Sequence, residues 1–120
     1  MRQLRVNGVD LSYIEQGTST PVVFVHGAWM DLRYWEPQRQ AIATQYRFMA
    51  YNLRYHGTAP WPDAGQHYSV ATHAADLAGF IHQLQAQPCR RCLRAAVVPY
   101  TAVAPVIVGA SLLPISAQGC

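Results

Sequence analysis

The sequence contains no lysine and has little charge of either sign. Charged residues make up 12% of the 120 residues, and the formal net charge of +3 comes from nine arginines against six acidic residues. Apart from Arg90, Arg91 and Arg94, the arginines are scattered along the chain. A scattered excess of this size favours a solvated surface over a nucleic-acid-binding or membrane-binding surface. We therefore expect no nucleic-acid partner.

Cysteine is also scarce, and its pattern does not indicate a disulfide framework. Cys89, Cys92 and Cys120 are an odd number of thiols. Cys89 and Cys92 have C-x-x-C spacing, but there is no second pair for a four-ligand zinc site, and a redox pair normally opens a helix after a strand. His73 and His82 are too far apart to share a metal on one helical face. We expect no metal and no cofactor.

The N-terminus lacks an apolar run after its first arginines, which argues against a secretory signal. A cytoplasmic protein is the default expectation. The oligomeric state is left open by the sequence.

The last part of the chain lacks charge altogether. From Ala95 to Cys120 there is no charged residue, and the apolar run is interrupted by prolines at 99, 105 and 114. Because composition changes after Pro88, we divide the chain into residues 1–88 and an apolar tail, residues 89–120. A truncated or frame-shifted gene product is one hypothesis for this tail, and a natural short protein with a new ending is the other.

A membrane span is a further interpretation of the tail. Arg90 and Arg91 precede an uncharged run that is long enough to span a bilayer, although three prolines and few Leu or Phe make its hydrophobicity marginal. A membrane-tethered or partner-bound module that uses this tail is therefore the non-enzymatic alternative.

Residues 1–88 show the pattern of an α/β protein. Asn7-Gly8 predicts a two-residue hairpin turn, and Val22–Val25 predicts a strand that is buried on both faces. A helix is expected from near residue 35 to about residue 44, and a strand over residues 46–52. Ser69 predicts the cap of a second helix. The helical stripe of this second helix comprises Val70, His73, Ala74, Leu77, Ile81 and Leu84. The tail could add one more strand, at residues 103–108.

Four blocks in this region, in order and spacing, resemble the N-terminal part of the α/β-hydrolase family. They are "VVFVHGAW", "WEPQ", "YRFMAYNLRYHGTAPWP" and "YSVATHAADLAGFIHQL", and the resemblance covers about residues 1–88. It implies an incomplete α/β fold: an antiparallel hairpin, then parallel strands with flanking helices. Members of the family hydrolyse esters and related small molecules with a Ser-His-Asp type triad and need no cofactor.

The resemblance also assigns an oxyanion-binding turn. His26 and Gly27 match the family's His-Gly turn, and the backbone N–H of Ala28 would donate to the oxyanion. Trp29 and Trp35 are candidates for a substrate pocket, with packing against the sheet as the alternative. The segment "NLRYHG" carries an asparagine at residue 52 where the family often has an acid, so it is expected to shape a loop.

The nucleophile is harder to place. Gly109-Ala110-Ser111 is the nearest match to the family's G-x-S-x-G elbow, and Leu113 occupies the position of the second glycine. No acidic residue follows Asp76 and no histidine follows His82, so Ser111 has no later acid or base. A hydroxyl without a base is a poor nucleophile. We expect an ester-like substrate for full-length relatives and no activity from this chain alone.

Overall fold

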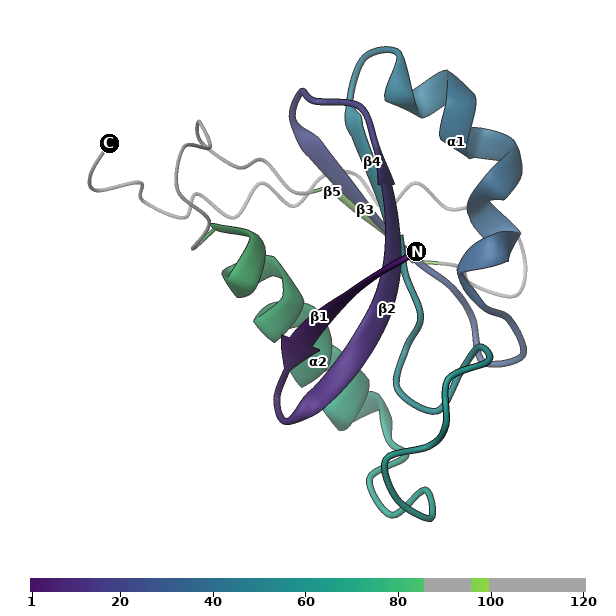
Figure 1. Ribbon diagram of the computed structural model, residues 1–120, viewed down its shortest axis with the longest axis vertical. Helices are drawn as coiled ribbons and strands as arrows, with labels where there is room; N and C mark the ends of the chain where they lie inside the picture. Colours follow the sequence, from purple (N-terminus) through teal and green to yellow (C-terminus); the bar gives the residue numbers. More distant parts are fainter. Residues whose placement is uncertain (86–95, 100–120) are drawn as a thin grey trace.

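The fold is a single mixed sheet with a helix on each face. The structure, a computed structural model, describes residues 1–85 and 96–99 (Figure 1). Its elements are β1 (Arg2–Val6), β2 (Val9–Gln16), β3 (Pro21–Val25), the 3-10 helix η1 (Leu32–Trp35), α1 (Glu36–Ala43), β4 (Arg47–Tyr51), α2 (Val70–Gln85) and β5 (Ala96–Pro99). The strand order is β1-β2-β4-β3-β5. The predicted α/β class with an antiparallel edge is confirmed.

The first two strands form the predicted hairpin. Val6 pairs with Val9, so Asn7 and Gly8 alone make the turn. Their φ angles are 48° and 81°, and a two-residue turn with two positive φ angles matches the twist of the flanking strands. This geometry explains the Asn-Gly pair, because both residue types tolerate the left-handed region.

The central strands β3 and β4 are parallel neighbours. Val22 pairs with Phe48 and Val25 with Tyr51, while β2 pairs with β4 antiparallel on the other side. A parallel fifth strand, Ala96–Pro99, pairs with β3. The structure thus has its fifth strand earlier than the predicted 103–108, a segment that lies outside the described residues.

Alternation along the strands divides the apolar side chains between two cores. On one face, Val23, Met49 and Tyr51 pack with the α2 residues Phe80 and Leu84. The opposite face carries a second cluster of Phe24, Phe48, Ala50, Leu32 and Trp35, against which α1 residues pack. All five residues of β4 are buried. A strand covered on both faces has a continuous apolar run, which is why β3 and β4 were recognisable.

The second helix begins as predicted but turns a different side toward the sheet. The Thr72 N–H donates to Ser69 Oγ at 3.1 Å, which confirms the cap. Val70, however, is 85% exposed and Ala74 is exposed too, so their predicted place on the buried stripe is wrong. Phe80, which the stripe omitted, is fully buried.

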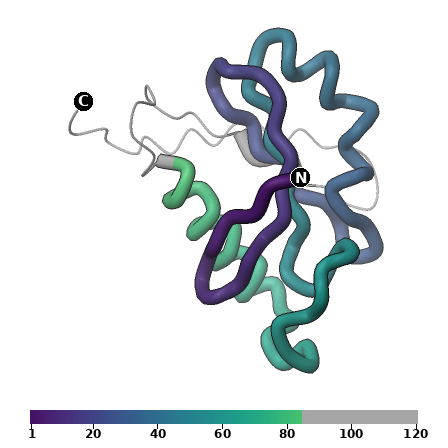
Figure 2. The backbone as a smooth tube through the Cα atoms, in the orientation of Figure 1, coloured from purple at the N-terminus to yellow at the C-terminus, as the bar shows by residue number. Residues whose placement is uncertain are grey.

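Close approach of α2 to the hairpin explains this rotation. A Cβ added to Gly79 would lie 2.7 Å from Val6 Cγ1, so the glycine lets the helix backbone approach β1. The tube in Figure 2 shows α2 running beside the hairpin. The contact stripe therefore centres on the turn that contains Asp76, Gly79 and Phe80.

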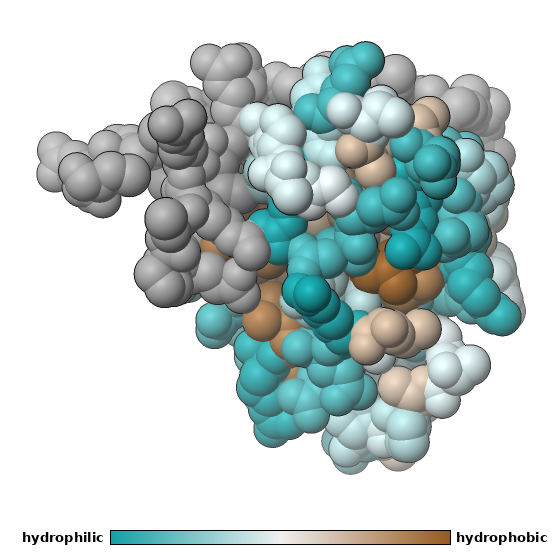
Figure 3. Space-filling view, turned by 45° about the horizontal axis from the view of Figure 1, so that its top comes forward, coloured by the Kyte–Doolittle hydropathy of each residue, from teal (hydrophilic) through white to brown (hydrophobic). Residues whose placement is uncertain are grey.

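Most apolar side chains of residues 1–85 lie in or against the two cores, and the visible surface is correspondingly polar. The face shown in Figure 3 is mostly hydrophilic, with hydrophobic atoms confined to small areas. Within residues 1–85 and 96–99, no helix combines the length and apolar character that crossing a membrane requires.

Candidate functional site

Two loops meet at the carboxyl ends of β3 and β4. Because these strands are parallel and Val25 lies beside Tyr51, the residues that follow each strand leave the sheet at the same edge. We refer to residues 26–32 and 52–57 together as the carboxyl-edge site. Ligands of open α/β sheets bind outside the carboxyl ends of the strands. β5 ends at this edge as well, since Pro99 pairs with Val25.

His26 joins the two loops and is a structural residue in this arrangement. Its side chain accepts the Leu53 N–H at Nε2, at 3.0 Å, and its Nδ1 lies 2.8 Å from the Gly27 carbonyl oxygen. Since a backbone N–H can only donate, Nε2 is the acceptor and Nδ1 carries the hydrogen. Burial lowers the pKa of His26 to about 4, and the nearby His56 adds to the shift. Both nitrogens are occupied, so the ring has no free lone pair to act as a base.

Asn52 makes the second connection between the loops. Its Oδ1 accepts the Leu32 N–H at 2.8 Å, and both groups are buried. Gly57, with φ of +79°, packs directly on this side chain, because an added Cβ would lie 2.2 Å from Asn52 Nδ2. Asn52, at the position where the resemblance led us to expect an acid, thus acts as a neutral acceptor that anchors the start of η1.

Tyr55 adopts a backbone conformation that tyrosine rarely takes. Its φ is 70°, in the left-handed region. The side chain compensates: its hydroxyl lies 2.9 Å from Asp63 Oδ1 and accepts the His67 N–H, and the ring packs against Trp61 and Tyr68. These contacts hold the strained residue in place, and with it the loop on either side.

His56 makes the third connection between the loops. Its Nε2 lies 2.9 Å from the carbonyl oxygen of Ala28, the predicted oxyanion residue. Nδ1 lies 2.9 Å from the Arg54 carbonyl oxygen. Both nitrogens of His56 therefore face main-chain acceptors.

His73 of α2 packs against the rings of His56 and Tyr68 and forms an aromatic cluster with them. The ring centroids of His56 and His73 are 5.8 Å apart, and Tyr68 lies 5.3 Å from His73. Burial lowers the pKa of His73, and His56 lowers it further. Neither ring nitrogen of His73 has a hydrogen-bond partner in the described part of the chain. Across residues 1–85 and 96–99, no group of three His, Cys, Asp or Glu side chains is placed to hold a metal ion.

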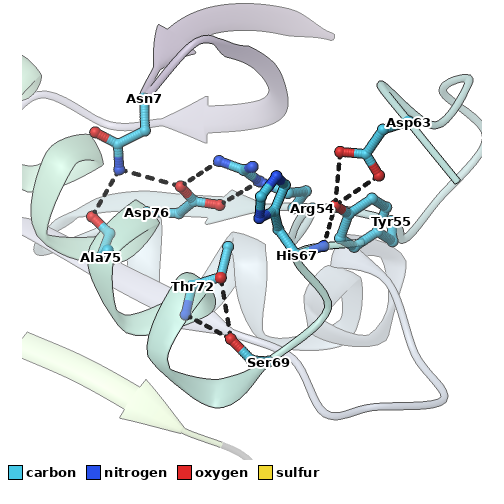
Figure 4. A network of polar contacts seen from close by, with 9 residues as sticks. All are labelled: Asn7, Arg54, Tyr55, Asp63, His67, Ser69, Thr72, Ala75 and Asp76. Carbon is cyan, nitrogen blue, oxygen red and sulfur yellow. Dashed lines mark hydrogen bonds and ion pairs between the residues drawn. The ribbon is translucent and has the colours of Figure 1, made fainter. Parts of the chain in front are cut away.

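A buried ion pair ties the second loop to α2, as Figure 4 shows. Arg54 donates from Nε and from a terminal nitrogen to Asp76, at 3.0 and 2.9 Å, and Asp76 is 1% exposed. Asn7 donates to the same carboxylate and to the Ala75 carbonyl oxygen, each at 3.1 Å. The pair raises the pKa of Arg54. This network was not predicted from the sequence. A signal was present, because an acidic residue such as Asp76 among the apolar residues of a helix indicates a buried, oppositely charged partner.

The two tryptophans of the predicted pocket lie in very different surroundings. Trp35 is 3% exposed and packs on Phe24, with ring centroids 5.1 Å apart, so it belongs to the core, as the packing alternative predicts. Trp29 is 99% exposed, and the alternative of packing against the sheet is therefore wrong for this residue. Ser111 lies outside the described residues.

Comparison with known proteins decides the family. A sequence profile of the alpha/beta hydrolase family matches residues 22–112. The chain belongs to the α/β-hydrolase family. The match runs past Pro88 and includes Ser111, so it extends over most of the tail.

Solved structures of other α/β-hydrolases share this fold. An epoxide hydrolase from Vigna radiata has a TM-score of 0.71 and 25% sequence identity over 82% of this chain. The Cif epoxide hydrolase from Acinetobacter nosocomialis has a TM-score of 0.68 and 25% identity, also over 82%. An enol-lactonase from Burkholderia xenovorans has a TM-score of 0.68 and 24% identity over 83%. This 120-residue chain spans only part of each of these proteins: 30% of the Vigna radiata enzyme, 29% of the Acinetobacter nosocomialis enzyme and 37% of the enol-lactonase.

Proposed function

We propose that this chain forms the oxyanion-binding side of a hydrolase site for an ester or a related small molecule, such as a lactone. The observation that carries the proposal is the His26-Gly27-Ala28 turn at the carboxyl edge of β3, in a member of the α/β-hydrolase family. The similar structures, two epoxide hydrolases and an enol-lactonase, support hydrolysis as the reaction class.

The geometry of the turn suits an oxyanion donor. The Gly27 carbonyl oxygen lies 2.8 Å from His26 Nδ1 and accepts the Met30 N–H at 3.2 Å. This carbonyl belongs to the same peptide plane as the Ala28 N–H, so fixing one fixes the direction of the other. A donor that is fixed before the reaction stabilises developing negative charge without reorganisation.

The two histidines beside the oxyanion turn, His26 and His56, are both engaged in holding the main chain. Both nitrogens of His26 and of His56 face main-chain groups. Ser111 is followed by no histidine and no acidic residue within these 120 residues. An unassisted serine hydroxyl attacks esters poorly near neutral pH. We therefore propose that the chain alone does not hydrolyse esters, and that its role requires a nucleophile and base from elsewhere.

Hydrolysis of p-nitrophenyl acetate tests the second part of this proposal. Purified protein is compared with Ser111→Ala, and Ser116→Ala serves as a matched tail control. We expect the same rate from all three. A rate that disappears in Ser111→Ala and persists in Ser116→Ala would make Ser111 a working nucleophile and contradict the proposal.

Anion binding tests the oxyanion turn itself. Protein labelled with ¹³C′-glycine and ¹⁵N-alanine reports only Gly-Ala pairs, which occur at Gly27-Ala28 and Gly109-Ala110. An Ala110→Val variant removes the second signal and assigns the first. Titration with acetate, the product anion, is expected to shift the Ala28 amide signal. An Ala28 signal that stays fixed at saturating acetate would count against an oxyanion role.

The alternative is a membrane-tethered or partner-bound module, and it rests on the uncharged run from Ala95 to Cys120. Solubility without detergent separates the two functions. A membrane module becomes more soluble when residues 89–120 are removed. A hydrolase domain that uses β5 in its sheet becomes less soluble, because removal exposes the apolar edge of β3.

A further inference from the structure

The two peptide groups that flank residue 28 are each held by a histidine. The preceding peptide, which carries the Ala28 N–H, has its carbonyl oxygen 2.8 Å from His26 Nδ1. The following peptide has its carbonyl oxygen 2.9 Å from His56 Nε2. Rotation of either peptide plane about the Ala28 backbone bonds therefore breaks a hydrogen bond.

The His56 ring is itself held by its loop. The backbone N–H of His56 donates to the Leu53 carbonyl oxygen at 3.0 Å, and the ring nitrogen Nδ1 lies 2.9 Å from the Arg54 carbonyl oxygen. Arg54 is in turn paired with Asp76 of α2. The ring position is thus set by β4 and α2, whereas Ala28 follows β3.

We propose that His56 is a positioning residue for the oxyanion-binding turn. Its Nε2–H donates to the Ala28 carbonyl and so fixes the peptide plane that follows Ala28. With the preceding peptide held by His26, this restricts rotation about the Ala28 backbone bonds and keeps the Ala28 N–H in place. The inference rests on the proposed function of this turn. Both the neutral tautomer with hydrogen on Nε2 and the imidazolium make this bond. His56 acts here through Ala28 and is not a general base, because its Nε2 points at a carbonyl oxygen.

The carbonyl signal of Ala28 tests the inference without any need for activity. Ala28-Trp29 is the only Ala-Trp pair in the sequence, so ¹³C′-alanine with ¹⁵N-tryptophan gives one signal for this peptide. We compare wild type with His56→Leu, which removes the donor, and with His56→Gln, which keeps an N–H at similar reach. His82→Leu is the control, since His82 is exposed on α2.

We expect the Ala28 ¹³C′ signal to move upfield in His56→Leu, because the carbonyl loses a donor, and to stay near its wild-type position in His56→Gln and His82→Leu. An unchanged signal in folded His56→Leu overturns the inference. A direct measurement covers the case in which His56→Leu fails to fold. The ¹⁵N signal of His56 Nε2 in wild type must show an attached hydrogen, and a bare nitrogen overturns the inference.

These results separate the inference from the proposed function. The carbonyl bond is measured without ligand, whereas the oxyanion role is tested by acetate titration of the Ala28 amide. If the hydrogen bond from His56 to the Ala28 carbonyl is present but acetate does not shift the Ala28 amide signal, the proposed function is refuted and the hydrogen bond stands. Acetate binding without the bond would refute the positioning role alone.

Discussion

Acidification from about pH 7.5 to about pH 5 is expected to destabilise the fold through His26. The pKa of this ring is about 4 in the folded protein, against 6.5 for an exposed histidine. Between these values the unfolded chain binds more protons than the folded one, so the free energy of unfolding falls as the pH falls below 6.5 and levels off below 4. Integration of this difference gives a loss of about 2 kcal/mol at pH 5 and about 3 kcal/mol in full.

The cause is the hydrogen bond from Leu53 N–H to His26 Nε2, at 3.0 Å. A proton on Nε2 turns this buried acceptor into a donor that faces another donor. Protonation therefore requires the two loops of the carboxyl-edge site to separate.

Urea unfolding at both pH values, followed by tryptophan fluorescence, measures the effect. Wild type and His82→Asn, which alters an exposed ring, should lose stability alike. For His26→Asn, the free energy of unfolding should fall by about 2 kcal/mol less between the two pH values, because the ring whose protonation opposes folding is absent. Equal losses in wild type and His26→Asn would refute the reasoning. So would an NMR titration in which the folded His26 ring titrates near 6.5.

Three further predictions concern the packing around the site, and two of them include a matched control substitution. Asp76→Asn breaks a buried ion pair and is expected to cost about 3–5 kcal/mol in urea unfolding. Asp10→Asn breaks an exposed pair and should cost about 1 kcal/mol or less, so equal costs would contradict the assigned burial. Gly57→Ala should destabilise more than Gly8→Ala. Both have positive φ, but only at Gly57 does the new Cβ collide with an asparagine side chain. Thermal melts that rank them in the opposite order would exclude this collision. Tyr51→Phe should leave stability unchanged or raise it by about 1 kcal/mol, because the buried hydroxyl has no hydrogen-bond partner among the residues that the structure describes. A clear loss would reveal a partner for that hydroxyl.

Much of the fold could be predicted from local patterns. The Asn7-Gly8 turn requires two positive φ angles that its own residues tolerate, and β3 and β4 are apolar because both faces are covered. The buried side of α2 could not be predicted in this way. It depends on how closely Gly79 approaches Val6, a contact between residues far apart in the chain. Periodicity within the helix does not contain this information.

The candidate site was predictable only in part. His26, Gly27 and Ala28 were found by resemblance, because they are consecutive and follow a recognisable strand. Their environment was not found. The hydrogen bond between His56 and Ala28 joins residues 28 positions apart, and that between Asn52 and Leu32 spans 20 positions. Such contacts follow from the parallel pairing of β3 with β4, which places the two loops together.

This dependence on parallel pairing has a consequence for folding kinetics. The β1–β2 hairpin closes a two-residue turn, and hairpins form in about 1–10 μs. The carboxyl-edge site, in contrast, needs β3 and β4 in register with the η1–α1 crossover between them, and contacts of this sequence separation form slowly. In refolding followed by pulsed hydrogen exchange, the amides of β1 and β2 should become protected first. The Leu32 and Leu53 amides, which bond across the two loops, should become protected last.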